Sequence, residues 1–164
     1  MPPVSDGTVV PGNAALTELN RAARLADIHE PYQQAIAQTL AARDAMGQES
    51  VLISLHSFTP ALRNGSPRPW QIGVLHGGGD ASFATALLTS LRHDSTLTVG
   101  DNEPYRMDLI DYTTPRHAYP QARAYAELEM RQDLISAANG QSWWAARLGR
   151  ELRSSHCSSR MSPV

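Results

Sequence analysis

The feature that most constrains the fold is an apolar run over residues 51–55 that ends at His56. Its aliphatic and β-branched side chains follow one another almost without a polar break, which is typical of a strand that is buried on both faces. Pro60 then marks a turn. A histidine at the carboxyl end of such a strand lies where open α/β sheets bind their ligands. His56 is therefore a candidate site residue, although a histidine that stands alone at a strand end more often completes a turn.

A second segment, residues 124–133, alternates polar and apolar side chains. A period of two places Glu127, Glu129 and Arg131 on one face of a strand and aliphatic side chains on the other. Carboxylates on an inner strand are costly unless they are paired, hydrogen-bonded or bound to a metal. The segment therefore predicts a strand with a charged, functional face.

A third, short strand is expected over residues 97–99, and it runs into a polar loop that contains Asp101, Asn102 and Tyr105. The three strand ends together present imidazole, carboxylate, guanidinium, amide and phenol groups. Such a gathering of polar groups favours a binding or catalytic site over three unrelated turns.

The remaining segments are interpreted from periodicity and turn residues. A strand is expected over residues 71–75, followed by a glycine loop at residues 77–79 that lacks the spacing of a nucleotide-binding fingerprint. Strands that alternate with helices predict an α/β fold with a mixed, mostly parallel sheet flanked by helices. We expect one domain over residues 1–153 and a disordered tail over residues 154–164, which is rich in serine and arginine. Helices are expected over residues 14–28, from Pro31 to Gly47, around residues 83–91, over residues 133–139 and around residues 144–152.

Charge and composition exclude several classes of function. The net charge of −2 gives no electrostatic reason to expect nucleic acid or an anionic membrane as a partner. No apolar run approaches the roughly 20 residues of a membrane span, and the first residues lack the features of a signal peptide. The single cysteine, Cys157, fits a reducing compartment. We therefore expect a cytoplasmic protein.

A histidine beside carboxylates suits two kinds of chemistry. One is general acid–base catalysis by the pair alone. The other is metal-assisted hydrolysis, with His56 as a metal ligand and Glu129 as the base. Arg131 lies on the same face as Glu129 and could bind a substrate carboxylate; a salt bridge to Glu127 or Glu129 is the equally favoured alternative.

Several motifs, taken in order, resemble the N-formylglutamate amidohydrolase family. Together they run from about residue 5 to about residue 150, and their combination is specific although each alone would be weak. The motifs are Asp-Gly-Thr at residues 6–8, Pro-Gly-Asn at 11–13, His-Ser-Phe-Thr-Pro at 56–60, Arg-Pro-Trp at 68–70, Gly-Val-Leu at 73–75, Gly-Asp-Asn-Glu-Pro-Tyr at 100–105, Asp-Tyr-Thr at 111–113, His-Ala at 117–118 and Glu-Met-Arg-Gln-Asp-Leu-Ile at 129–135.

The resemblance implies a three-layer, phosphorylase/hydrolase-like fold similar to that of the zinc carboxypeptidases. It implies a Zn²⁺ cofactor with His56 as a ligand, and Glu129 as the general base. The small-molecule substrate would be N-formyl-L-glutamate or a similar N-acyl amino acid, and the products formate and glutamate, at the end of histidine degradation. The residues that it places toward the substrate are Arg68, Asp101, Asn102, Tyr105, His117 and Arg131.

The sequence departs from the family pattern at its beginning. Family members carry further strands there, with a histidine motif and the remaining metal ligands, whereas this sequence starts shortly before Asp6. We therefore expect an N-terminally truncated fold that lacks those ligands. The alternative function is a catalytically inactive domain that binds an acidic amino acid or a partner chain.

Overall fold

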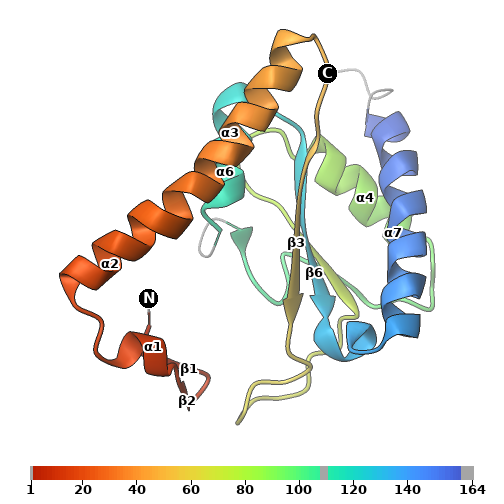
Figure 1. The fold of residues 1–164 in the computed structure, drawn as a ribbon. Helices are drawn as coiled ribbons and strands as arrows, with labels where there is room; N and C mark the ends of the chain where they lie inside the picture. Colours follow the sequence, from red (N-terminus) through yellow and green to blue (C-terminus); the bar gives the residue numbers. More distant parts are fainter. Residues whose placement is uncertain (1, 108–110, 160–164) are drawn as a thin grey trace. The chain divides into compact units, whose positions relative to one another are not determined.

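A computed structural model of the chain describes residues 2–107 and 111–159 (Figure 1). Contacts divide the chain into two compact units. The first comprises residues 1–49 and 61–66, and the second residues 50–60 and 67–164. The second unit contains the sheet and the strand ends that the sequence singled out. Two such units can still fold together, so the single domain over residues 1–153 stays a prediction.

The first unit is a small hairpin followed by one long helical segment. The sequence predicted two helices with a break before Pro31, but the helical segment is continuous there. A π-helical turn precedes the proline, in which the Glu30 N–H bonds to the Leu25 carbonyl, five residues back. The helix ends at Ala45, two residues before Gly47, which has a φ of +66° in the turn that follows. The elements are β1 (Val4–Ser5), β2 (Thr8–Val9), α1 (Pro11–Ala14), α2 (Glu18–Arg24), η1 (Leu25–His29) and α3 (Glu30–Ala45).

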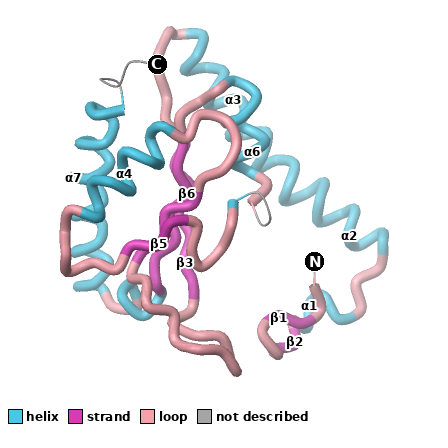
Figure 2. The backbone as a smooth tube through the Cα atoms, turned by 180° about the vertical axis from the view of Figure 1, so that it is seen from behind, coloured by secondary structure: helices cyan, strands magenta, loops and turns pink. Residues whose placement is uncertain are grey.

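The second unit is built on four strands, which lie side by side in Figure 2. They are β3 (Leu52–Phe58), β4 (Ile72–Leu75), β5 (Val99–Asp101) and β6 (Tyr125–Arg131), in the order β3-β6-β4-β5. The β3–β6 and β4–β5 pairs are parallel, and the β4–β6 pair is antiparallel. The prediction of a mixed, mostly parallel sheet is therefore confirmed. The edge strand β3 and the inner strand β6 bring His56 and the two glutamates to one place.

One face of this sheet is apolar and is covered by α4 (Ser82–Arg92) and α7 (Ala138–Ser159), as Figure 1 shows. The leucines of α4 recur at steps of three and four, so they form one stripe that packs on the sheet. Trp144 and Leu148 form the matching stripe of α7. The buried core here comprises Ile72, Val74, Phe83, Ala84, Leu87, Leu88, Leu91, Ala126, Leu128, Trp144 and Leu148.

Helix α7 differs from the sequence-based expectation at both ends. Gly140 does not end a helix; it lies in the first turn of α7, after the 3₁₀ turn η3 (Gln132–Ile135). The tail was expected to be disordered from residue 154, but residues 154–159 are helical and Ser155 is buried. A packed apolar stripe stabilises a helix well beyond what composition suggests, so the serine-rich sequence was misleading. Residues 160–164 lie outside the described residues.

The other face of the sheet carries the polar groups and a smaller core. Leu75, Met107, Ala118 and Tyr125 form this core beside α6 (Thr113–His117) and the 3₁₀ turn η2 (Tyr119–Gln121). Tyr125 also holds the glycine loop, because its hydroxyl accepts from the Gly77 N–H at 2.8 Å and donates to the Gly78 carbonyl at 2.7 Å. Helices therefore flank both faces, which gives the three-layer α/β arrangement that was predicted.

Gly73 on β4 is required by a close approach of the backbone. It lies opposite Glu129 in the β4–β6 pair, and a Cβ at this position would collide with the carbonyl oxygen of Glu103. Gly73→Ala is therefore expected to lower the free energy of unfolding by about 1–3 kcal/mol, measured by urea denaturation. The matched control is Gly149→Ala within α7, where the nearest atom is a flexible arginine nitrogen at 3.5 Å and a stabilisation of up to about 1 kcal/mol is expected. A Gly73→Ala protein as stable as the wild type would contradict the close approach.

Candidate functional site

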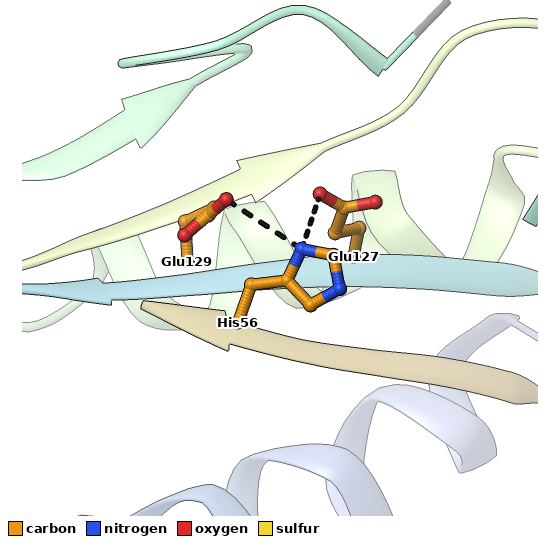
Figure 3. Close-up of side chains that lie close together, drawn as sticks. All are labelled: His56, Glu127 and Glu129. Atoms are coloured by element: carbon orange, nitrogen blue, oxygen red, sulfur yellow. Dashed lines mark ion pairs between the residues drawn. The ribbon is translucent and has the colours of Figure 1, made fainter. Parts of the chain in front are cut away.

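The candidate site lies where β3 and β6 run side by side. His56 is the register partner of Glu129, and Glu127 lies two residues earlier on the same face of β6. The Nδ1 atom of His56 is 3.2 Å from Oε1 of Glu127 and 3.7 Å from Oε1 of Glu129. Figure 3 shows this nitrogen directed at both carboxyl groups. The structure therefore gathers one imidazole and two carboxyl groups at a single point.

The two glutamates are buried, whereas the histidine is open to solvent. Glu127 is 0% exposed, Glu129 is 3% exposed, and the His56 side chain is 46% exposed. Burial raises the pKa of Glu127 to about 8, and the negative charges of Asp111 and Glu129 contribute in the same direction. A carboxyl group with this pKa is largely protonated at neutral pH unless a cation replaces the proton.

Glu129 has the properties of a general base that works near neutral pH. Burial raises its pKa to about 7, and the positive charge of Arg68 partly offsets that rise. A general acid or base is most effective when its pKa lies near the working pH. Glu129 and Glu127 therefore have different electrostatic surroundings although they share one face of one strand.

Arg68 and Tyr105, both predicted as substrate-binding residues, lie next to each other near Glu129. The Nη1 atom of Arg68 is 3.3 Å from the Tyr105 hydroxyl, and its guanidinium group stacks over the Tyr105 ring at 5.2 Å. The same Nη1 atom donates to the carbonyl and hydroxyl oxygens of Thr59. All of these acceptors are neutral.

Arg131 does not form the salt bridge to Glu127 or Glu129 that the sequence left open. It binds Asp133 instead, with Nε 2.8 Å and Nη2 3.2 Å from the two carboxylate oxygens. Arg131 is the last residue of β6, and a two-residue step around the following 3₁₀ turn brings Asp133 within reach. This pairing lowers the pKa of Asp133.

The loop after β5 is directed elsewhere. Asp101 accepts one hydrogen bond from Arg92 and contacts Nε2 of His76 at 2.9 Å, and Asn102 accepts from the His76 backbone N–H. These two residues therefore hold His76 rather than contact the His56 cluster. His117 lies buried at the end of α6, where burial and the charge of Arg116 lower its pKa.

Two contributors to the site were not predicted from the sequence. Asp111 precedes α6 and raises the pKa of Glu127. Burial would raise the pKa of Asp111 itself, but hydrogen bonds from Thr114 and Thr113 outweigh it and hold the pKa below the ordinary value. Ser54 lies two residues before His56, and its hydroxyl is 3.3 Å from Nε2 of the imidazole. The period of two along β3 was the only sequence signal for Ser54.

The site has the donor atoms that a divalent metal ion needs. Ligand atoms of His56, Glu127 and Glu129 all lie within 4.8 Å of one another. Imidazole and carboxylate are ordinary zinc ligands. Within the described residues, both carboxylate oxygens of Glu127 and Oε2 of Glu129 are buried without a hydrogen-bond partner. Unsatisfied buried acceptors of this kind fit a cation-binding site.

The fold and this site define an α/β protein with a histidine–carboxylate centre on two neighbouring parallel strands. A family model described as N-formylglutamate amidohydrolase matches residues 1–136. The chain therefore belongs to the N-formylglutamate amidohydrolase family, as its motifs suggested. No curated protein matches the sequence.

Two solved structures are similar to the chain. The crystal structure of a gene product from Agrobacterium tumefaciens is 33% identical with a TM-score of 0.88, and the match covers 96% of this chain and 62% of that one. The N-formylglutamate amidohydrolase from Ralstonia eutropha is 20% identical with a TM-score of 0.60, covering 88% and 57%. The second likeness shows the fold alone. This chain thus spans less than two thirds of either solved protein.

Among the helices in the described part of the chain, none is long and apolar enough to cross a membrane.

Proposed function

We propose that the protein is a metal-dependent amidohydrolase that cleaves N-formyl-L-glutamate or a similar N-acyl amino acid into formate, or another acid, and the free amino acid. The family match supports this class of reaction. The observation that carries the proposal is the register of β3 and β6, which places His56 beside buried Glu129. Such a reaction would belong to histidine degradation, and the single cysteine fits a cytoplasmic enzyme.

Each of the two residues has its own role in the proposal. His56 would hold the metal ion, and Glu129 would accept the proton of the attacking water. When bound, Zn²⁺ would polarise the amide carbonyl and make water more acidic. Glu129 is shielded from solvent and has a pKa near neutral, so it can take a proton and later return it to the leaving amine.

Arg68 is the best-placed group for a carboxylate of the substrate. Its Nη1 atom bonds only to neutral acceptors among the contacts described above, while Arg131 is already paired with Asp133. A charged hydrogen bond to a ligand contributes about 1.5–3 kcal/mol. Arg68→Gln is therefore expected to raise KM for N-formyl-L-glutamate by about 10- to 100-fold, with a smaller effect on kcat. Steady-state kinetics would measure both, and a KM that rises more in Arg131→Gln would reverse the assignment.

The proposed function is tested by formate release. The 164-residue protein is supplied with Zn²⁺ and assayed with N-formyl-L-glutamate, and N-formyl-L-lysine serves as a control with the opposite side-chain charge. Turnover that depends on metal and prefers the acidic substrate supports the proposal. If no formate appears while N-formyl-L-glutamate still raises the melting temperature, the alternative of an inactive domain that binds an acidic amino acid is correct instead.

A further inference from the structure

Glu127 has no role in the proposed reaction, yet its burial in a charged state would be costly. The side chain is 0% exposed, and by hydrogen-bond geometry neither carboxylate oxygen has a partner within the described residues. Its neighbours are the half-exposed imidazole of His56, at 3.2 Å, and the carboxyl group of Asp111, which adds to the effect of burial in raising its pKa. An ionised carboxylate that is buried without full compensation destabilises a protein by several kcal/mol in general. Aliphatic side chains of similar size fill most inner-strand positions without this cost, so the presence of glutamate here requires a reason.

The distance between Glu127 and His56 matches the distance between two ligands of one metal ion. Zinc binds histidine nitrogen and carboxylate oxygen at about 2.0–2.2 Å in a tetrahedral arrangement, which separates two donor atoms by about 3.3–3.6 Å. Oε1 of Glu127 and Nδ1 of His56 are 3.2 Å apart. Oε1 of Glu129 is 3.7 Å from the same nitrogen, which is also close to this range. What distinguishes Glu127 is that both of its carboxylate oxygens are buried without a hydrogen-bond partner among the described residues, whereas only Oε2 of Glu129 is.

The second nitrogen of His56 is oriented for this arrangement. Metal-binding histidines usually donate their other ring N–H to a nearby acceptor, which fixes the tautomer. The Ser54 hydroxyl lies 3.3 Å from Nε2 and can accept that proton, so that the Nδ1 lone pair faces Glu127. In Figure 3 the imidazole of β3 lies against the two carboxyl groups of β6, with Nδ1 toward them.

The surrounding charges also favour a cation. Asp111 and Glu129 both act on Glu127, and Arg68 acts on Glu129. A divalent ion held by His56 and Glu127 would offset the negative charge that gathers at this point.

We propose that Glu127 is a metal ligand, and that it forms with His56 a two-residue metal-binding edge contributed by the β3–β6 pair, beside which Glu129 remains free to act as the base. The ion is a divalent transition metal, Zn²⁺ by preference and Mn²⁺ as the harder alternative, because the donor set combines an imidazole with a carboxylate. This inference rests on the metal dependence in the proposed function, but it concerns binding and can be measured without turnover.

The test measures Zn²⁺ binding to the metal-free 164-residue protein by isothermal titration calorimetry. The wild type is expected to bind about one ion, and Glu127→Gln and His56→Gln are each expected to weaken binding by at least about 100-fold. Glu129→Gln is expected to change it by less than about 10-fold. The matched control is Glu151→Gln, which removes a carboxylate of α7 that contacts Ser90 and Arg147 on the other side of the sheet; its binding should equal that of the wild type.

Folding and coordination are followed separately. Thermal unfolding of the metal-free variants shows whether each remains folded, and glutamine at position 127 is isosteric with the glutamate. The visible absorption of bound Co²⁺ reports the ligands directly, so Glu127→Gln should change its spectrum at saturating metal, and Glu151→Gln should not.

The inference is overturned if Glu127→Gln binds Zn²⁺ as tightly as the wild type, or if the wild type binds no stoichiometric ion. It is also overturned if loss of binding is greater in Glu129→Gln than in Glu127→Gln. Failure of the proposed function would be seen differently. In that case the metal-loaded wild type releases no formate, whichever residues bind the ion.

Discussion

Replacement of Glu129 by glutamine is expected to lower kcat for formate release by about 10²–10⁴-fold, the range that general-base catalysis contributes. Glutamine keeps the size and can accept hydrogen bonds, but it cannot take a proton at neutral pH. Glu129 is buried beside His56, and its pKa of about 7 lies where a base is most effective. Removal of a buried carboxylate should also leave the metal-free protein at least as stable as before.

The measurement is single-turnover and steady-state kinetics at saturating N-formyl-L-glutamate and Zn²⁺, with the Glu151→Gln protein as control. Both variants lose one carboxylate of the second unit, and only the first loses one that faces the site. A Glu129→Gln enzyme with kcat within threefold of the wild type would refute the role of Glu129 as base. A pH–rate profile gives a further check, because the rise in kcat near pH 7 should disappear with the glutamate.

The parts of the fold that could be predicted are those that short patterns determine. The apolar run before His56 and the alternation around Glu129 became β3 and β6, because periodicity is a local property of a strand. The expected burial of the first run on both faces was wrong, because β3 is an edge strand and Leu55 is 60% exposed. Their pairing brought the two residues into register, which supports the expectation of a shared site at the strand ends. Arg68 and Tyr105 also meet near this point.

The parts that failed depend on contacts between distant segments. The π-helical turn before Pro31 and the extension of α7 to Ser159 reflect helix continuity and packing, and neither has a short sequence signal. The partner of Arg131 depended on a tight turn that brings Asp133 back toward the strand. The raised pKa of Glu127 depends in part on Asp111, which lies just before α6. The two residues are sixteen positions apart in the sequence (127 − 111), so no short pattern links them.

The free energy of unfolding of the metal-free protein is expected to fall as the pH rises from about 5 to about 8. Glu127 has a folded-state pKa of about 8 and Glu129 of about 7, against an ordinary value of 4.5. Between these limits the folded protein holds more protons than the unfolded chain, so stability decreases with pH. Their contribution is fully present below pH 4.5 and is lost as the pH rises through 7 and 8. One pKa unit corresponds to about 1.4 kcal/mol, so the combined loss is on the order of several kcal/mol.

The Glu127→Gln protein separates this effect from other titrations. His117, with its lowered pKa, acts in the opposite direction around its ordinary value of 6.5, but it is present in both proteins and cancels in their difference. Urea denaturation should therefore find the two proteins about equally stable at pH 5, and Glu127→Gln more stable than the wild type by a few kcal/mol at pH 8.5. Saturating Zn²⁺ should remove most of the wild-type decline, because an ion that binds the ionised carboxylates stabilises the folded state where the protons leave it. If the free energy of unfolding changes with pH in the same way in the two metal-free proteins, Glu127 is ionised and hydrogen-bonded in the folded protein. Its burial then needs no cation.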